Sequence, residues 1–419
     1  MGIAGLLQYL STSLVTKHIS SYAHKTLAID GYYLLHRASY CCSKPLVLGE
    51  PTSNYLVHCL KFLSSLLNSN IKPFLVFDGR SLPSKDATDL NRRKTRQIAK
   101  DQAIELLQAG DSQAANRIFP RAVSVTNNMV MKLVFICKKL NISVMRAPYE
   151  ADAQIAFLVK NHVVDGVLAE DSDFIIWGMD LILFKFKLEN GYLEEFDSSR
   201  LNVFHPSFSE LQEAAILSGC DYLPNPPGIG IKTAIKYRSG SNTVFGMIKA
   251  LKSQGKIDND YICGYIKALI TFNCQMVYDP FAGECLCLND YNEYVRSLYQ
   301  KCEFYPEIQE LLDNLNLFSG LPDFLGIPMT KEVVYGVSTF YLDPKNFEII
   351  PKISIGDVEI QMLLKSKNTS ISNLLSTIKS SQSSQTFLHS TNFPRSNLSR
   401  TPKTTIKTPI KTNGNFSPF

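Results

Sequence analysis

Cysteine is scarce in this chain, long apolar runs are absent, and the N-terminus shows no features of a signal peptide. Ten cysteines in 419 residues are too few for a disulfide scaffold. Cys285 and Cys287 form an isolated C-x-C pair, so reduced thiols are expected rather than a zinc site. Because no run of 18 apolar residues occurs and MGIAGLLQYL lacks a charged n-region, we expect neither a transmembrane helix nor a secretory leader.

Strong net charge is also lacking, but the charge is unevenly distributed. The whole chain carries +5. From Pro351 onward it holds nine Lys or Arg and two Asp or Glu, a net charge of +7, so the preceding 350 residues carry −2. A nearly neutral domain still binds nucleic acid if its charges are segregated. The positions of the acids and bases therefore decide the interpretation.

The last segment has few large apolar groups. Residues 366–419 hold 21 Ser or Thr among 54 positions, and such a segment buries too little apolar area to offset the entropy lost on ordering. We therefore predict that residues 351–419 form a disordered, basic, Ser/Thr-rich tail. Its Ser-Pro, Thr-Pro and Ser-Gln pairs suit a phosphorylated, partner-binding segment, although a merely flexible extension explains them equally well.

The rest of the chain has ordinary globular composition, with 45% hydrophobic residues overall. Its first 200 residues alternate short apolar runs with helical patterns. Strands are predicted at 25–30, 71–78, 142–148 and 165–173, and helices at 53–68, 127–140 and 150–161. Strands that alternate with helices indicate an α/β domain with a largely parallel central sheet over residues 1–200.

Two segments depart from this alternation. Residues 80–126 are polar, basic and helical in pattern, and we interpret them as a helical cap inserted over the edge of the sheet. From Ser209 the pattern is mostly helical, with helices predicted at 209–219 and 257–279. Residues 201–350 are therefore predicted to form a second, helical lobe.

Three predicted strands end in carboxylates, at Asp30, at Asp78 and at the pair Asp171 and Asp173. Ligand sites in open α/β sheets form at the carboxyl ends of the strands. Residues two apart on an extended segment face the same side, so Asp171 and Asp173 are expected to point the same way. These acids are therefore predicted to meet at one edge of the sheet.

Two further carboxylates, Glu150 and Asp152, begin the helix at 150–161. Acidic residues are common in a first helical turn because they interact favourably with the helix dipole, but this does not explain five to six carboxylates that converge. Such a cluster repels itself unless cations neutralise it. Mg²⁺ prefers carboxylate and water oxygens, and two ions about 3.5–4 Å apart suit an in-line phosphoryl displacement. The sequence predicts two Mg²⁺ ions here, with Mn²⁺ as a substitute.

Basic residues recur along the predicted cap helix in PSKDATDLNRRKTRQIAK (83–100). At 100° per residue, Lys85, Arg92 and Arg96 lie within about 40° of one another. A solvated helix face with Asp89 as partner explains this stripe by itself. Its position just after Asp78 favours contact with a phosphate beside the metals, where cations stabilise developing charge.

A glycine-rich loop, GIGIK (228–232), lies between two predicted helices. Gly228 and Gly230 allow a phosphate to approach the backbone, and the following helix offers free N–H groups. Lys232 adds positive charge, but two glycines in a turn are common and this motif alone is weak evidence. Asp221 precedes the loop, where it either reaches the metals or simply ends its helix.

The ordered motifs together resemble the structure-specific five-prime nucleases of the flap endonuclease and XPG superfamily. They are MGIAGLL at the N-terminus, LAIDGYYLLH (27–36), IKPFLVFDGRSLPSK (71–85), APYEADAQIA (147–156), EDSD (170–173) and LSGCDYLPNPPGIGIKTA (217–234). The resemblance covers about residues 1–325. Flap endonucleases typically read SEAEA where this chain reads YEADA, and they end in a clamp-binding Q-x-x-[LIM]-x-x-[FY]-[FY] motif that is not found here. These differences favour the exonuclease branch of the superfamily.

The resemblance implies roles for individual residues. The metal-binding carboxylates of the family match Asp30, Asp78, Glu150, Asp152, Asp171, Asp173 and Asp221. The phosphate-steering cations of the family match Lys85 and Arg92, whereas Thr95 replaces a nearby family arginine. Together with the GIGIK loop, the residues expected to contact DNA are Gly2, Tyr32, His36, Arg96, Arg121, Gly228, Gly230 and Lys232. Without the family, a helix-surface histidine explains His36 equally well.

The helical lobe resembles the helix–two-turn–helix unit that holds duplex DNA through a bound K⁺. The ligands of that ion are largely backbone carbonyls, at positions matching Ser218, Asn225 and Ile229. Residues 224–227 depart from the family pattern, because Pro, Asn, Pro and Pro replace a Ser-containing stretch.

The resemblance implies a PIN-like five-prime nuclease fold and a nuclear, monomeric enzyme of DNA repair, acting in mismatch repair and end resection. The expected activity is metal-dependent five-prime-to-three-prime exonuclease cleavage of duplex DNA, with five-prime flap endonuclease activity. The tail is then expected to bind repair proteins. Two alternatives remain open: a flap endonuclease of replication, and a non-catalytic DNA-binding scaffold, which the complete set of acids disfavours.

Overall fold

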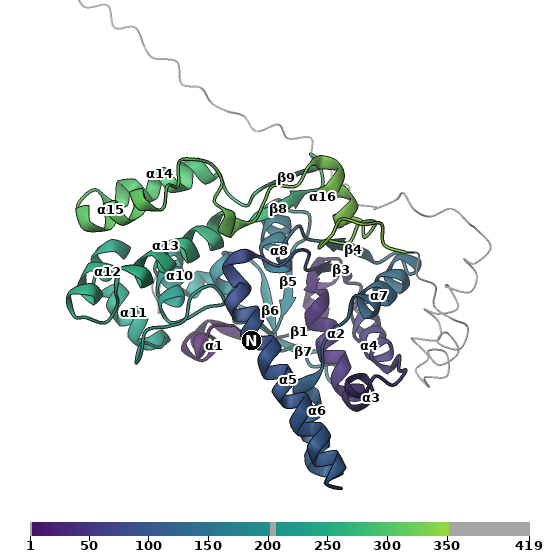
Figure 1. The fold of residues 1–419 in the computed structure, drawn as a ribbon. Coiled ribbons are helices and arrows are strands. Elements are labelled where there is room, and N and C mark those ends of the chain that lie inside the picture. Colours follow the sequence, from purple (N-terminus) through teal and green to yellow (C-terminus); the bar gives the residue numbers. More distant parts are fainter. Residues whose placement is uncertain (1, 202–206, 352–419) are drawn as a thin grey trace, which may run out of the picture.

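A seven-stranded sheet runs through the middle of the molecule, with helices on both of its faces (Figure 1). The computed structural model describes residues 2–201 and 207–351, so the predicted tail lies outside the described residues except for Pro351. Within them, no helix is both long and apolar enough to span a membrane. All ten cysteines are free thiols, and Cys285 and Cys287 lie on one short strand.

The sheet is largely parallel, as predicted. Its strand order is β1-β7-β6-β5-β2-β3-β4. The five adjacent strands from β6 to β4 are parallel, whereas β7 is antiparallel to both of its neighbours. The strands are β1 (Leu14–His18), β2 (Thr26–Asp30), β3 (Lys72–Phe77), β4 (Ser143–Arg146), β5 (Gly166–Ala169), β6 (Ile182–Phe184) and β7 (Tyr192–Phe196).

Alternate residues of the central strands enter two different hydrophobic cores. Leu27 and Ile29 of β2 belong to a core shared with α2, α4 and α7, whereas Ala28 belongs to a core shared with α8 and the helical lobe. Because successive strand residues face opposite sides, a strand that is apolar at every position is covered on both faces. The helices of this region are α1 (Leu6–Tyr9), α2 (Gly31–Ser39), α3 (Ser43–Leu48), α4 (Asn54–Asn68), α7 (Asn127–Lys139) and α8 (Ala151–Lys160).

The chain changes direction across the sheet between β2 and β5. From β2 it proceeds to β3 and β4 on one side, and it then returns to β5 and β6 on the other. Such a switch leaves a crevice outside the carboxyl ends of the strands. The last residues of β2 and β3 and the turn after β5 therefore meet at this point.

The predicted cap is a helical hairpin made of α5 (Asp86–Gln108) and α6 (Ser112–Ala122). The two helices pack through small and aromatic residues, which include Ala103, Ala115 and Phe119. The far end of the hairpin projects away from the sheet (Figure 1). A short 3-10 turn, η4 (Pro83–Lys85), starts the hairpin, and its last residue contacts Glu150 at the start of α8.

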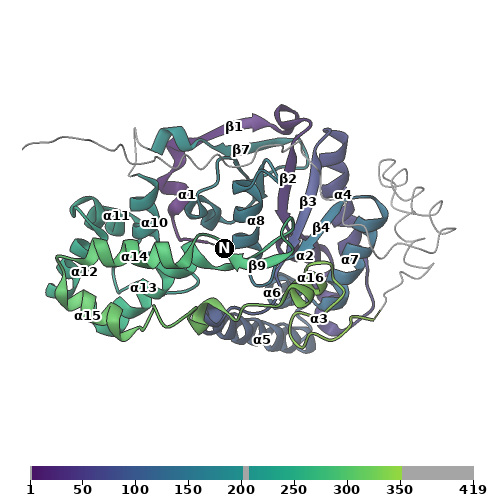
Figure 2. The same cartoon turned by 90° about the horizontal axis from the view of Figure 1, so that it is seen from above.

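The helical lobe lies to one side of the sheet, and α2, α4 and α7 lie on the other (Figure 2). Its helices include those predicted at 209–219 and 257–279, which are observed as α10 and α13. The helices that follow β7 are α10 (Phe208–Leu217), α11 (Ile231–Ser239), α12 (Val244–Ser253), α13 (Asn259–Cys274), α14 (Tyr291–Cys302), α15 (Pro306–Asn314) and α16 (Lys331–Ser338).

The predicted helix at 257–279 is wrong at its end. Helix α13 stops at Cys274, and β8 (Met276–Asp279) follows it and pairs antiparallel with β9 (Glu284–Cys287). The β8 backbone is also held by Gln154 of α8, whose side chain bonds both the N–H and the carbonyl of Tyr278 at 2.8 and 2.9 Å. These long-range partners override the helical continuation of the apolar pattern.

A buried ion pair joins two helices of the lobe and yields a stability prediction. Arg238 of α11 contacts Glu213 of α10, with side chains only 9% and 7% exposed, and it donates to the Ser241 carbonyl at 2.8 Å. Arg238→Ala leaves Glu213 buried without its cation, so we expect the free energy of unfolding to fall by about 3 kcal/mol. Lys252→Ala, which removes the more exposed pair with Glu307, should cost less than about 1 kcal/mol. Equal losses in urea denaturation would contradict this role of the buried pair.

Candidate active site

Carboxylates from four segments of the chain lie at the switch point of the central sheet. Asp30 is the last residue of β2 and the N-cap of α2, and Asp78 directly follows β3. Glu150 is the N-cap of α8, and Asp152 lies in its first turn. The segment after β5 supplies the remaining pair of acids.

That pair, Asp171 and Asp173, is not on a strand. Strand β5 ends at Ala169, and Asp171 is the N-cap of a 3-10 helix, η5 (Ser172–Trp177), whose first turn contains Asp173. The predicted strand at 165–173 was therefore too long. The Asp171 side chain accepts the Asp173 N–H at 3.0 Å, which favours a capped turn over an extended chain. The two acids nevertheless remain close neighbours.

Backbone N–H groups hold four of these acids in place. The Oδ1 atom of Asp30 accepts the Tyr32 N–H at 2.8 Å, and that of Asp78 accepts the Ala151 N–H at 2.7 Å. Asp173 Oδ1 accepts from the Ile3 N–H at 2.8 Å, which brings the start of the chain into the site. Since each bond uses Oδ1, the second carboxylate oxygen is left to turn toward a ligand.

The backbone at Gly2 also lies close to the acids. Its φ of +89° lies in the left-handed region, and a Cβ atom here would stand 2.1 Å from Asp171 Oδ1 and 2.4 Å from the Ser172 hydroxyl oxygen. Only glycine fits such an approach. The predicted DNA-contact residue Gly2 therefore lies against the acids.

Burial and mutual repulsion raise the pKa values of these acids. Burial and then repulsion from Asp78 raise the pKa of Asp30 to about 7, and burial and Asp171 raise that of Asp173 to about 8. The same two causes raise the pKa of Asp152 well above its ordinary value. Burial is also the main cause of the raised pKa of Asp171. This is the expected state of gathered carboxylates that no cation neutralises.

Two basic side chains of the cap, Lys85 and Arg92, contact carboxylates of this cluster. Lys85 contacts Glu150 and lies 2.9 Å from Asp221 Oδ2. Arg92 Nη2 donates to both oxygens of Asp221, at 2.7 and 2.9 Å. Lys85 is the last residue of η4 and not part of α5, so the predicted helical stripe applies only to Arg92 and Arg96.

Around Lys85 and Asp221, the attraction between opposite charges outweighs the effect of burial on the pKa values. Burial alone would lower the pKa of Lys85, but Glu150, Asp221 and Asp152 raise it well above its ordinary value. Burial opposes ionisation of Asp221 as well, yet Lys85 and Arg92 lower its pKa overall. Asp221, from the helical lobe, is therefore joined to the cap, whereas the acids of the sheet remain mutually repelling.

Two residues that hold Glu150 were not predicted. The Tyr222 hydroxyl and the Gln275 side-chain amide both donate to Glu150 Oε2, the latter at 3.0 Å. The only indication of this role for Tyr222 in the sequence is its position directly after Asp221. Gln275 is completely buried between α13 and β8, and a polar residue between apolar runs indicates a buried partner without identifying it.

The donor set fits hard divalent cations, but the ligands are not arranged around an ion. Among the described residues, no three Asp, Glu, His or Cys side chains converge closely enough to hold a metal as they stand. Lys85 and the backbone N–H groups take up oxygens that an ion would need. Purely carboxylate oxygens suit Mg²⁺ or Mn²⁺ rather than zinc.

Two predicted DNA-contact residues lie on α2, beside the acids. The Tyr32 ring packs edge-on against Phe77, with the ring centroids 6.1 Å apart, and burial and Asp78 raise the Tyr32 pKa to about 12. His36 lies one turn further along, where burial and nearby Arg96 lower its pKa. Arg121 is exposed in the last turn of α6.

The glycine loop forms a separate group in the helical lobe. A Cβ atom on Gly228 or Gly230 would meet nothing within 4 Å, so the backbone between α10 and α11 is open to a ligand, and Lys232 beside it is exposed. The positions matched to the K⁺ ligands lie around the same loop. Here the Asn225 side-chain amide donates to the Ile229 carbonyl at 3.0 Å, so that carbonyl keeps one lone pair for another partner.

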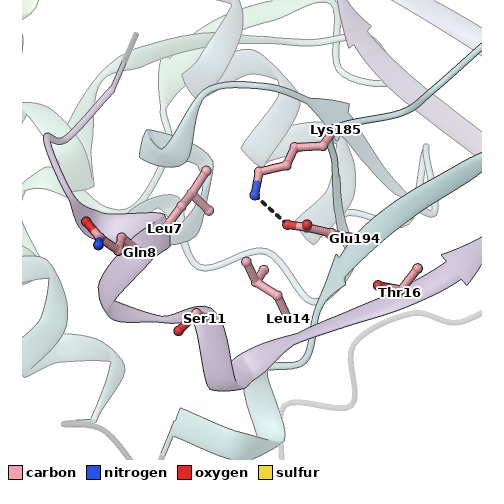
Figure 3. A pocket seen from close by; sticks show the side chains of 7 residues that line it. All are labelled: Leu7, Gln8, Ser11, Leu14, Thr16, Lys185 and Glu194. Atoms are coloured by element: carbon pink, nitrogen blue, oxygen red, sulfur yellow. Dashed lines mark ion pairs between the residues drawn. The ribbon is translucent and has the colours of Figure 1, made fainter.

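A surface pocket lies elsewhere, at the antiparallel side of the sheet (Figure 3). It contains none of the predicted site residues, and a Lys185–Glu194 ion pair of 2.7 Å spans it. Its lining residues are Leu7, Gln8, Ser11, Leu14, Thr16, Lys185 and Glu194.

Comparison with known proteins gives matches over the same segments. The XPG N-terminal domain matches residues 1–99, and the XPG I-region matches residues 141–221. Exonuclease 1 of Danio rerio is 36% identical over 306 residues, covering 70% of this chain and 38% of that protein. Exodeoxyribonuclease 1 of Saccharomyces cerevisiae is 34% identical over 312 residues, covering 72% of this chain and 44% of that protein. The chain thus spans less than half the length of these relatives.

Among solved structures, the catalytic core of Rad2 in complex with a DNA substrate is 17% identical, with a TM-score of 0.47 over 90% of this chain and 100% of that chain. The two matched family regions contain all seven of the predicted site carboxylates. The chain thus contains the N-terminal domain and the I-region of XPG proteins, and it is similar to exonuclease 1 proteins from animals and yeast.

Proposed function

We propose that this protein is a divalent-metal-dependent nuclease that degrades one strand of duplex DNA from a five-prime end and also cuts five-prime flaps. The observation that carries the proposal is the convergence of buried, mutually repelling carboxylates beneath Lys85 and Arg92. Its relatives are named exonuclease 1 and exodeoxyribonuclease 1. The complete set of acids supports catalysis over a role as a DNA-binding scaffold.

The proposed metal ligands are the seven predicted carboxylates. Mg²⁺ ions bound here would activate water and stabilise the oxygens of an in-line displacement. Backbone N–H groups orient Asp30, Asp78 and Asp173, and Tyr222 and Gln275 orient Glu150. These fixed partners limit the reorganisation needed when a cation enters.

Lys85 and Arg92 are proposed to hold the scissile phosphate. The neighbouring acids keep the pKa of Lys85 well above its ordinary value despite burial, so its ammonium stays charged at neutral pH. With cations held by Glu150 and Asp221, both basic side chains would be free to contact a phosphate. Positioned charges of this kind stabilise a phosphoryl-transfer transition state.

The remaining residues are proposed to place the DNA. Tyr32 lies near Asp78 and Asp30, and His36 lies near Arg96. Tyr32, His36 and Arg96 would contact nucleotides near the cleavage point, together with Gly2 and with Arg121 further along the cap. Backbone N–H groups near Gly228 and Gly230, together with Lys232, would bind a phosphate of the duplex. Carbonyls of Ser218, Asn225 and Ile229 would hold a K⁺ ion.

The biological setting is part of the same proposal. The family resemblance supports a nuclear, monomeric repair enzyme that acts in mismatch repair and end resection, with repair proteins as partners of the tail. Cleavage of labelled duplexes that carry a nick, a gap or a free flap, with and without Mg²⁺, tests the activity. A strong preference for flaps over recessed duplex would instead favour a replication flap endonuclease.

Replacement of a metal ligand is expected to separate chemistry from binding. Asp173→Ala should abolish Mg²⁺-dependent cleavage and leave the Kd for DNA within a few-fold, because the carboxylate acts on the reaction rather than on docking. Asp111→Ala, which removes the N-cap of α6, is the control. Cleavage by Asp173→Ala above about a tenth of the wild-type rate would refute its assignment as a ligand.

Removal of either cap cation should slow the reaction more than it weakens binding. Lys85→Ala and Arg92→Ala are each expected to lower the single-turnover rate by roughly ten- to a thousandfold, the usual scale for one preorganised charge. The exposed Lys94 of the same helix provides a matched control, Lys94→Ala. Equal losses of rate and affinity would mean that Lys85 and Arg92 only position phosphates.

The raised acid pKa values predict an unusual dependence of stability on pH. The folded pKa values of Asp30 and Asp173, about 7 and 8, exceed their unfolded values. Their contribution to the free energy of unfolding is therefore complete below about pH 4, and it is lost as the pH rises through 7–8. In EDTA, Tm should therefore fall between pH 6 and 9, and Mg²⁺ should raise Tm more at pH 9 than at pH 6. The Asp30→Asn variant should show a weaker pH dependence in EDTA; an unchanged slope would contradict the assignment.

A further inference from the structure

Tyr149 is a buried residue to which the proposed reaction gives no role. It begins the YEADA motif that distinguishes this chain from the SEAEA pattern, and it directly precedes Glu150. Its side chain is 1% exposed. The hydroxyl donates to the Ile327 carbonyl at 2.9 Å and accepts the Ile327 N–H at 2.7 Å. One phenol thus satisfies both backbone groups of a residue 178 positions away.

The chain that returns from the helical lobe is shaped to receive this ring. Gly326 adopts a φ of +88°, and a Cβ atom there would lie 2.2 Å from Tyr149 Cζ. Only glycine permits both the left-handed backbone and the close approach. Residues 321–329, which we call the return segment, therefore fit closely over Tyr149.

A small hydrophobic cluster connects this contact to the cap. Leu82, Tyr149 and Met276 pack together away from the main cores. Leu82 precedes the η4 turn that ends in Lys85, and Met276 follows Gln275, which donates to Glu150 at 3.0 Å. Within the return segment, the 3-10 turn η7 (Asp323–Leu325) packs against η4.

Each of the three cluster residues is thus close in sequence to a group at Glu150. Leu82 precedes Lys85, Tyr149 precedes Glu150 itself, and Met276 follows Gln275. Lys85 contacts Glu150 from the cap side, and Gln275 contacts it from the lobe side. The return segment closes the cluster, and the Tyr149 hydroxyl supplies two hydrogen bonds that hold it there. A serine at position 149 is too short to reach Ile327.

We propose that Tyr149 is a positioning residue for the cleavage reaction: its hydroxyl locks the return segment beneath η4 and thereby fixes Lys85 over Glu150 and Asp221. This inference rests on the proposed nuclease function. Tyr149 touches neither substrate nor the reacting atoms, and its effect passes through Lys85. The clamp also links the end of the helical lobe to the geometry of the cap.

Tyr149→Phe tests the clamp, because it keeps the ring and removes only the hydroxyl. The single-turnover rate at saturating full-length enzyme should fall by roughly three- to tenfold or more, the scale of one to two lost net hydrogen bonds, with the Kd for DNA within about twofold. Tyr291→Phe is the matched control, because the buried Tyr291 hydroxyl also bonds a backbone carbonyl, that of Leu317, at 2.8 Å. A similar rate loss in both variants would indicate only lost stability and overturn the proposal.

A double-mutant cycle with Lys85→Ala shows whether the effect passes through Lys85. If it does, Tyr149→Phe lowers the rate no further in the Lys85→Ala background. The same fold loss in both backgrounds would overturn the positioning role. Hydrogen exchange gives a readout independent of cleavage: Tyr149→Phe should speed exchange of the Ile327 and Lys85 amides, and unchanged exchange refutes the clamp. Absence of Mg²⁺-dependent cleavage by the wild type would instead refute the proposed function.

Discussion

The repulsion among the gathered carboxylates is the constraint on which the rest of this structure depends. Five aspartates and a glutamate converge where the sheet reverses its strand order, and burial prevents water from screening their charges. The fold compensates with backbone N–H groups from α2, α8, η5 and even Ile3. The start of the chain and the helix N-termini are therefore part of the site and not merely its frame.

Two basic side chains that are not part of the sheet also reduce the repulsion among the carboxylates. Lys85 and Arg92 enter on the cap, and they bind Glu150 and Asp221 rather than the acids at the strand ends. The pKa shifts divide in the same way. The pKa of Asp221 is lowered, whereas the pKa values of Asp30, Asp152 and Asp173 are raised. A divalent cation would therefore gain most on the uncompensated side.

The parts that sequence could predict are those with a strong local signal. The strands at 25–30 and 71–78 each contain an unbroken apolar run, at 27–29 and 73–77, and a parallel strand covered on both faces gives that pattern. Their terminal acids could be assigned to one edge because parallel strands end together. The place where a strand stops is a weaker signal, and the Asp171 side chain, by capping η5, ends β5 earlier than its apolar pattern suggests.

Other features depend on partners that are distant in sequence, and no local pattern reports them. Strand β8 forms because β9 and Gln154 satisfy its backbone. The role of Gln275 depends on Glu150, and that of Lys85 on a short 3-10 turn that a helical projection could not anticipate. Sequence therefore identifies the acids of the site more readily than the groups that orient them.

The position of Asp221 connects the glycine loop to the acids through one short piece of chain. It follows the end of α10 and precedes the open backbone at Gly228 by only seven residues. Its carboxylate is held by Lys85 and Arg92, its carbonyl accepts the Thr88 hydroxyl at 2.7 Å, and its neighbour Tyr222 bonds Glu150. In the proposed function, a phosphate bound at the glycine loop would therefore act on a segment that is already bonded to the cap and the acids.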